Sequence, residues 1–320
     1  MRRDTVQRGS LLIITLWLVT ILSVLAIAVA RYLSVEVRLT KHRLAVEEAK
    51  ALARSGVYLA MQRLAQDVKP GADGKVYDWL GDEWAAPPGA DPAHPDAWVM
   101  EGMTIRITDE ERRLDLNAVS EPVLTRLLQA VAPASADLAR PILDDLDADD
   151  EGPLMGEPPY YPKNAPAAAL EELVDIPHAA EAFAALQPFL AVAPGTTAPP
   201  AVNINTAGRE VLLALGAEPA TIDALLAARP GTDQTWGTAD DCKATEISQA
   251  AIELAACALA GDTPKFVTLL SLPTAAFAVS SSRFRVTVDA VAGGREAKRH
   301  VEAVIQRAAD GSTILAWREG

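Results

Sequence analysis

The chain has 320 residues and half of them are hydrophobic, enough for one membrane helix and one or two folded domains. Its formal net charge is −14 at pH 7, which argues against binding of nucleic-acid phosphates, whereas loops rich in carboxylates suit hard cations such as calcium. The four histidines are scattered, and no motif of a phosphate-binding loop, a zinc protease or a serine hydrolase occurs. The sequence therefore points away from an enzyme.

Residues 10–30 form an apolar stretch without charge or proline. As a helix, these 21 residues span roughly 30 Å, the hydrocarbon thickness of a bilayer. Apolar residues continue at helical spacing to about Asp67. The sequence therefore predicts a transmembrane helix over 10–30 that continues as an amphipathic spine to about residue 67.

A basic leader of nine residues precedes this stretch and ends at Gly9. One interpretation is a secretory signal peptide, cleaved near the small residues Ala26, Ala28 and Ala30. However, the apolar stretch is longer than the core of a usual signal peptide, and the helical period crosses these alanines without a turn residue. We therefore predict cleavage between Gly9 and Ser10, which leaves the apolar helix on the mature protein.

The remaining chain predicts a β region that is divided by a helical one. Two tryptophans, Trp79 and Trp84, are expected to anchor a loop rich in proline and glycine to the domain. A strand is predicted between Trp98 and Leu116, followed by helices from 119 to about 274. The C-terminal residues alternate again as a meander of three antiparallel strands, with turns at Gly293-Gly294 and Asp310-Gly311.

The helical region contains an internal repeat, in which Leu114–Leu128 is similar to Val202–Gly216. Each copy begins with the order apolar, polar, apolar, Asn and continues as an apolar helix, and a second helix follows each copy. Ser120 and Thr206 are the expected N-caps. The predicted fold class is therefore α+β: a spine helix and an antiparallel sheet, split by a large all-α insert of two related helical subdomains.

The segment VNINTA at 202–207, followed by two helices, also resembles the helix-hairpin-helix modules of DNA-uptake proteins. Such modules hold a phosphate with backbone N–H groups in a glycine-rich turn. Here Glu218 and Pro219 occupy that turn, and a carboxylate repels phosphate while proline has no N–H to donate. The repeat is therefore interpreted as a structural relative that does not bind DNA.

Six carboxylates lie within the eight residues 144–151. Carboxylates this close repel one another unless water or a cation neutralises them. An EF-hand loop does not fit, because its sixth and twelfth positions would be Asp150 and Gly156 instead of Gly and Glu. A solvated acidic loop and a cation site are both open interpretations.

Cys242 and Cys257 are the two cysteines of the chain. In an oxidising compartment they can form a disulfide that closes a loop of about 15 residues and contributes roughly 3 kcal/mol. They can also remain separate thiols, with Cys257 packed in an apolar helix.

The leader, the retained apolar helix and its amphipathic extension resemble the prepilin-type signal of type IV pilins and type II secretion pseudopilins. Most members carry Glu at the fifth mature position, whereas the fifth residue counted from Ser10 is Ile14. The K-type minor pseudopilins of type II secretion, the general secretion pathway protein K family, also lack this Glu. The segments 144–161, 163–177 and 202–207 resemble segments of that family in the same order.

This resemblance implies a minor pseudopilin that forms the tip of the periplasmic pseudopilus with I-type and J-type partners. It implies cleavage by a prepilin peptidase, methylation of the new N-terminus, and a single-pass protein of the inner membrane with its soluble part in the periplasm. It also implies calcium bound in the helical part. The ligands that the family's motif points to are Asp144, Asp147, Asp149 and Glu157, although Asp145 replaces the family's Trp.

The domain boundaries that we expect are a leader at 1–9, a transmembrane helix at 10–30, a pilin-like domain at 31–118 plus 276–320, and an inserted helical domain at 119–275. Two other functions are open at this point. One is a membrane-anchored DNA-uptake protein of the helix-hairpin-helix type, and the other is a minor pilin of a type IV pilus.

Overall fold

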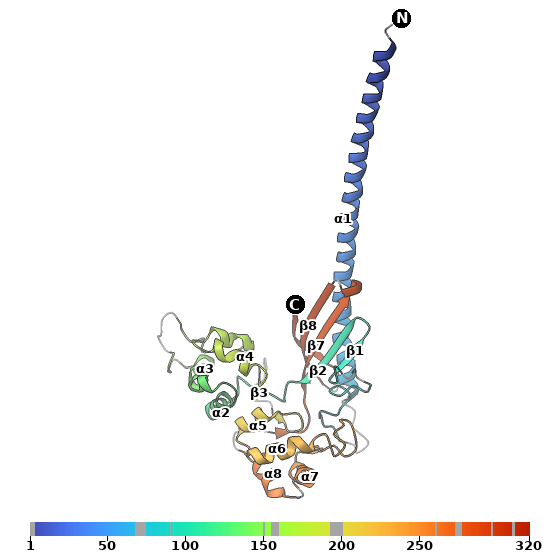
Figure 1. The fold of residues 1–320 in the computed structure, drawn as a ribbon. Helices are drawn as coiled ribbons and strands as arrows, with labels where there is room; N and C mark the ends of the chain where they lie inside the picture. Colours follow the sequence, from blue (N-terminus) through green and yellow to red (C-terminus); the bar gives the residue numbers. More distant parts are fainter. Residues whose placement is uncertain are drawn as a thin grey trace.

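One long helix, α1 (Asp4–Asp67), projects from a body made of a sheet and short helices (Figure 1). The computed structural model describes residues 4–67, 75–89, 91, 93–149, 151–154, 160–192, 201–259, 261–272, 277–295, 297–308 and 311–320, and for 4–10 and 295 the backbone alone. The N-terminus lies at the far end of α1, and the C-terminus lies beside the sheet.

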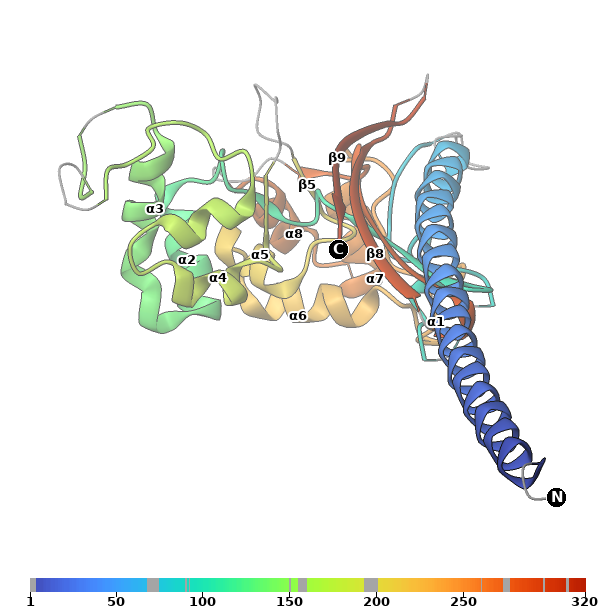
Figure 2. The same ribbon diagram turned by 90° about the horizontal axis from the view of Figure 1, so that it is seen from above.

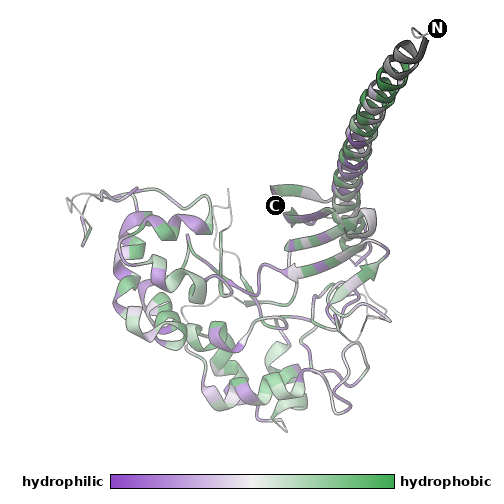
Figure 3. Ribbon diagram, turned by 45° about the horizontal axis from the view of Figure 1, so that its top comes forward, coloured by the Kyte–Doolittle hydropathy of each residue, from purple (hydrophilic) through white to green (hydrophobic). Residues whose placement is uncertain are grey.

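The two halves of α1 have opposite surroundings. From Leu11 to Leu39 every large hydrophobic side chain is at least 40% exposed, and Figure 3 shows this part of the helix as mostly hydrophobic. It is long and apolar enough to cross a membrane. In the second half, Ala53, Val57 and Leu64 are fully buried against the sheet. Within the described part of the chain, the sheet covers the second half of the helix and no other element covers the first half.

The main sheet has five antiparallel strands in the order β1-β2-β7-β8-β9. They are β1 (Ala97–Met100), β2 (Met103–Asp109), β7 (Arg283–Ala292), β8 (Ala297–Gln306) and β9 (Thr313–Glu319). The register places Ile105, Val288 and Val301 in one row under α1. The α+β fold class and the C-terminal meander are confirmed, with β1 and β2 completing the sheet.

The predicted strand-like run from Trp98 to Leu116 is confirmed in its alternating part, which is β2, but the run is not one strand. Gly102 has a φ of 76°, which reverses the chain between β1 and β2, so this stretch forms a hairpin. The chain then leaves the sheet at Asp109, whose carboxylate accepts a hydrogen bond from the backbone of Glu111 at 2.7 Å. Periodicity alone does not report such turns.

The loop that follows α1 is held by aromatic side chains, as predicted. Trp84 is buried in the sheet core and contacts the ring of Phe284 edge-on, with the centroids 5.2 Å apart. Trp79 is also buried, and the ammonium of Lys243 lies 3.9 Å from its ring centroid. These contacts join the loop to both the sheet and the helical region.

The helical region has its own hydrophobic core, separate from that of the sheet. The helical region and α1 lie on opposite sides of the sheet (Figure 2). The guanidinium of Arg318 on β9 forms an ion pair with the carboxylate of Glu171 in the helical region at 2.6 Å. Its longer helices are α2 (Glu121–Val131), α3 (Ala139–Leu146), α4 (Ala180–Leu186), α5 (Arg209–Leu215), α6 (Pro219–Ala228), α7 (Ala250–Ala258) and α8 (Thr263–Leu270). Three short 3-10 helices are η1 (Pro133–Leu138), η2 (Leu170–Asp175) and η3 (Gly293–Arg295), the last of which joins β7 to β8.

The repeat is visible in the structure. Short parallel strands, β3 (Leu114–Asp115) with β4 (Leu190–Ala191) and β5 (Val202–Asn203) with β6 (Phe277–Ala278), begin the two copies, and α2 packs against α5.

Matching asparagines play the same part in the two copies. The amide oxygen of Asn117 accepts from the Ala167 backbone and its NH₂ group donates to the same residue, and Asn205 makes the same pair of bonds with Ala244. One difference corrects our expectation: the N-cap of α5 is Gly208 and not Thr206. Ser120 is the N-cap residue of α2, but its hydroxyl makes no capping bond.

A disulfide joins Cys242 to Cys257 on α7, with the Cα atoms 5.6 Å apart, a usual separation for such a bond. It ties the loop after α6 to the core of the helical region, where Cys242 is buried.

Replacement of Gly56 tests the packing of α1 on the sheet. A Cβ atom at Gly56 would lie 2.7 Å from Cγ1 of the fully buried Val288. Gly56→Leu should therefore lower the free energy of unfolding by about 1–3 kcal/mol through overpacking. The matched control Ser55→Leu places the same side chain on the exposed neighbouring position and should change it by less than about 0.5 kcal/mol. Equal effects in chemical denaturation would contradict close packing here.

Candidate functional site

The residues predicted for processing lie in the first turns of α1. The backbone of Gly9 and Ser10 is helical, and the helix continues through both without a break. Ile14 is 59% exposed. This end of the chain therefore offers an apolar helix surface without a covering partner in the described residues.

The acidic run is divided into buried and exposed members. Asp144 and Asp145, at the end of α3, are buried. Asp144 accepts a hydrogen bond from the backbone of Leu154 at 2.9 Å, and Asp145 accepts from the hydroxyl of Tyr160 and from the backbone of Lys163. An added Cβ at Gly152 would overlap the Asp144 carboxylate, so glycine leaves room for this carboxylate. These two carboxylates hold the following loop in place.

The other predicted calcium ligands do not join them in the described part of the chain. Asp147 and Asp149 are exposed, and Asp149 accepts from the backbone of Glu151 at 2.9 Å. Glu157 lies outside the described residues. Among the described residues, Asp144, Asp147 and Asp149 do not bring oxygen atoms together as a group that could hold a metal ion. The calcium site at this run stays a prediction.

Two other groups of carboxylates do converge among the described residues. The first is Asp233, Asp240 and Asp241, in the loop before Cys242. Asp240 accepts hydrogen bonds from the backbone and hydroxyl of Thr232 and from the hydroxyl of Thr238, and the bonds from Thr232 and Thr238 lower its pKa. Asp240 therefore holds a turn in this loop, and the buried Asp241 does the same by accepting from the backbone of Gly237 and of Thr238.

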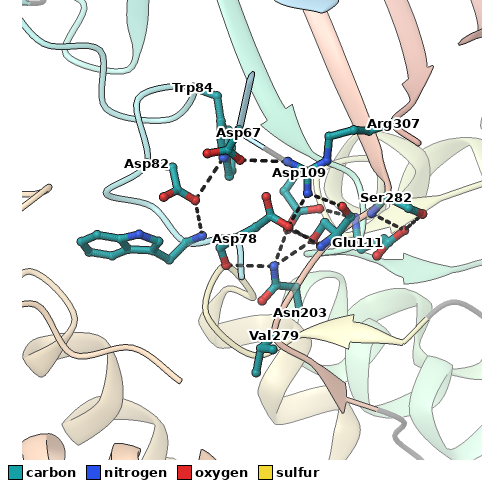
Figure 4. Close-up of polar contacts among 12 residues, drawn as sticks. Asp67, Asp78, Asp82, Trp84, Asp109, Glu111, Asn203, Val279, Ser282 and Arg307 are labelled. Atoms are coloured by element: carbon teal, nitrogen blue, oxygen red, sulfur yellow. Dashed lines mark hydrogen bonds and ion pairs between the residues drawn. The ribbon is translucent and has the colours of Figure 1, made fainter. Parts of the chain in front are cut away.

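The second group is Asp67, Asp78 and Asp82, shown in Figure 4. Asp67 is the last residue of α1, and Asp78 and Asp82 come from the loop after it. The guanidinium of Arg307 donates to Oδ2 of Asp67 at 2.8 Å and to Oδ2 of Asp78 at 2.6 Å. Oδ2 of Asp82 accepts from the backbone of Trp79 at 2.9 Å.

A network of buried polar groups continues from this group, and we call Asp78, Asp109, Asn203, Thr206 and Ser281 the junction cluster (Figure 4 labels three of them). Oδ2 of Asp109 accepts from Asn203 at 3.2 Å, from Thr206 at 2.5 Å and from Ser281 at 2.7 Å. The junction cluster lies where the chain leaves the sheet and where it returns. The asparagine and threonine of VNINTA thus fasten the insert to the sheet.

Burial raises the pKa values of three of these carboxyls. Desolvation raises the pKa of Asp82 to about 8, with the charge of Asp67 as a further cause. Desolvation and the charge of Asp78 raise the pKa of Asp67 to about 7. Desolvation also raises the pKa of Asp109 to about 7, although hydrogen bonds from Thr206 and Ser281 oppose the shift.

Our sequence analysis missed this site. Asp78 and Asp109 follow no metal-binding spacing, and Ser281 lies 203 positions from Asp78. The only local sign is an aspartate at the end of a long apolar-periodic helix, where the negative end of the helix dipole disfavours a carboxylate.

The junction cluster predicts a pH dependence of stability. Because the folded state holds a proton on Asp109 that the unfolded state releases near pH 4, the free energy of unfolding should fall as pH rises from 5 to 8. Asp109→Asn should reduce this slope, measured by urea unfolding with EDTA present. The control Asp96→Asn should leave it unchanged, because its bond with Arg106 lowers the pKa of Asp96, so that Asp96 is ionised across this range. Equal slopes in the wild type and Asp109→Asn would contradict the prediction.

A solved structure with the same fold is known. No protein-family model matches the chain, and no curated protein matches it. Among solved structures, the chain is similar to one in the crystal structure of the GspK-GspI-GspJ complex from the type 2 secretion system of enterotoxigenic Escherichia coli. The match has a TM-score of 0.62 and 19% sequence identity, and it covers 88% of this chain and 99% of that chain. The chain therefore has the fold of a GspK-like minor pseudopilin.

Proposed function

We propose that this chain is a K-type minor pseudopilin of a type II secretion system and has no enzymatic activity. The observation that carries the proposal is the combination in α1 of an exposed apolar half and a half buried against an antiparallel sheet, with a helical insert splitting that sheet. The similarity to the GspK-like fold over nearly the whole chain supports it. In this role the insert is a structural domain.

The exposed half of α1 anchors the protein in the inner membrane as a single span, and the soluble part lies in the periplasm. A prepilin peptidase removes residues 1–9, and the new N-terminus at Ser10 is methylated. Intact-mass measurement of protein extracted from membranes should therefore give a chain that begins at Ser10 and carries one methyl group. A chain that begins near Tyr32 would instead show a secretory signal peptide and would contradict the proposal.

The proposed role as a minor pseudopilin also implies protein partners. The similar solved chain occurs in a complex of GspK with GspI and GspJ, and we propose corresponding I-type and J-type pseudopilins as partners of this chain. Nucleic acid is not among the proposed partners. Glu218 directly precedes α6, and its carboxylate accepts a hydrogen bond from Thr221 in the first turn, so this helix start presents negative charge.

Calcium bound at the acidic run is part of the proposal. Asp147 and Asp149 are exposed and accessible to an ion, and Asp144 lies one turn before them. Glu157 would complete the set. Calcium would then order the loop by neutralising carboxylates that repel one another.

We further propose that the protein occupies the tip of the pseudopilus. In the interior of a pilin-like filament, a membrane-buried Glu can pair with the N-terminal ammonium of a neighbour. A subunit at the end lacks one such neighbour. An apolar residue such as Ile14, near the start of the span, then avoids an unpaired carboxylate. The cost of such a charge reaches on the order of 2.5–3.5 kcal/mol at the centre of a membrane and is smaller toward its surface.

Ile14→Glu should therefore weaken pseudopilus assembly and secretion, whereas the matched control Ile14→Leu should preserve both. Filaments carrying a tag in the described part of the insert, for example between α6 and α7, should bind antibody at one end when viewed by electron microscopy. Labelling along the whole shaft would show a building block of the filament body and would contradict the tip role. Improved secretion by Ile14→Glu would contradict the argument from Ile14.

A further inference from the structure

In the group formed by Asp67, Asp78 and Asp82, one oxygen of Asp78 has no hydrogen-bond partner among the described residues. Asp78 is fully buried, and its Oδ2 accepts from the backbone of Ser281 and from Arg307 at 2.6 Å each. Its Oδ1 has no hydrogen-bond donor among the described residues. A buried carboxylate oxygen without a partner is costly, so a further ligand of this oxygen is expected.

Two more carboxylates lie beside that of Asp78. One oxygen each from Asp67, Asp78 and Asp82 lies within 4.8 Å of the other two. Oxygen ligands of one calcium ion lie about 2.3–2.6 Å from it, so any two of them are at most about 5 Å apart. The spacing of the three carboxylates therefore matches one shared ion.

The charge balance also favours a cation. Arg307 is the one cation that the structure shows bonded to this group, and it binds Oδ2 of both Asp67 and Asp78. When all three carboxylates are ionised, one guanidinium does not balance their charge, and a divalent cation would neutralise the excess. Asp67 adds to it at the negative end of the α1 dipole. The side chain of Asp67 is 26% exposed, which gives an ion access and leaves room for water ligands.

We propose that Asp67, Asp78 and Asp82 bind a divalent cation of the calcium class at the junction of α1, the following loop and the end of β8. Calcium is favoured over magnesium because it accepts irregular arrangements of carboxylates, whereas magnesium requires a near-ideal octahedron. The ion would fasten the end of the spine helix to the sheet. This site is independent of the filament role and of the acidic run at 144–157.

The indole of Trp84 makes the site measurable. Its Nε1 donates to Oδ2 of Asp82 at 3.2 Å, so an ion bound there would lie close to a tryptophan. Terbium is a calcium analogue whose emission is sensitised by a nearby indole. Full-length protein in detergent, titrated with terbium under tryptophan-selective excitation, should show saturable emission that calcium displaces.

Asp82→Asn should weaken the apparent terbium affinity roughly tenfold or more, because the ligand loses its charge while its oxygen can still accept from Trp79 and Trp84. The matched control Glu83→Gln alters the adjacent exposed acid, which pairs with Arg63 outside the group, and should leave the affinity unchanged. Unchanged affinity in Asp82→Asn would overturn the proposal.

A second measurement guards against a folding defect in the variant. Calcium should raise the melting temperature of the wild type and of the double variant Asp147→Asn/Asp149→Asn, and this rise should be smaller in Asp82→Asn. A calcium effect lost only in the double variant would assign the ion to the acidic run and overturn this site without affecting the filament role. No calcium effect in the wild type at neutral pH would also overturn it, and would favour a proton shared between Asp67 and Asp78.

Discussion

The structure depends on how α1 divides its apolar surface between two environments. Its second half buries Ala53, Val57 and Leu64 against the sheet, which fixes the direction of the helix relative to the domain. Its first half keeps large hydrophobic side chains exposed over a length that suits a bilayer. Because the helix is continuous, an anchor in one environment orients the domain in the other. The spine helix thus links its exposed apolar half to the placement of the sheet and the insert.

A helical insert on this scaffold creates a second constraint, because both of its connections cross from one hydrophobic core to another. Backbone and side-chain polar groups are buried where the chain leaves β2 and where it returns to β7, and each needs a partner. The junction cluster provides these partners. Asn203 donates to Asp109, to Ser281 and to the backbone of Asp78, so one amide joins three segments of the chain. The residues that resemble a DNA-binding motif therefore serve the connection between domains.

Charge is concentrated in the same region. Arg307 lies over the ring of Phe284, 4.6 Å from its centroid, and holds Asp67 and Asp78 with the guanidinium. Removal of one member would leave a buried charge without a partner. The free-energy cost of that charge is larger than the stabilisation that the intact pair provides. We therefore expect the stability of the fold to depend on pH more at this junction than at the exposed ion pairs of the surface.

The sequence by itself determined the features that depend on near neighbours in the chain. The length of the spine helix and the alternation in β7 and β8 follow periods of a few residues, which periodicity reports directly, and the repeat is a similarity between two segments of the sequence itself. The tertiary structure alone decided which polar residues meet. Thr206 has the sequence context of a helix N-cap, yet its hydroxyl bonds Asp109, 97 positions away. Asp67, Asp78 and Asp82 converge because α1 ends against the sheet and Trp84 anchors the loop, whereas Asp147 and Asp149, with a suggestive spacing, remain at the surface. Contacts over such separations depend on the packing of whole elements, and local sequence carries no record of it.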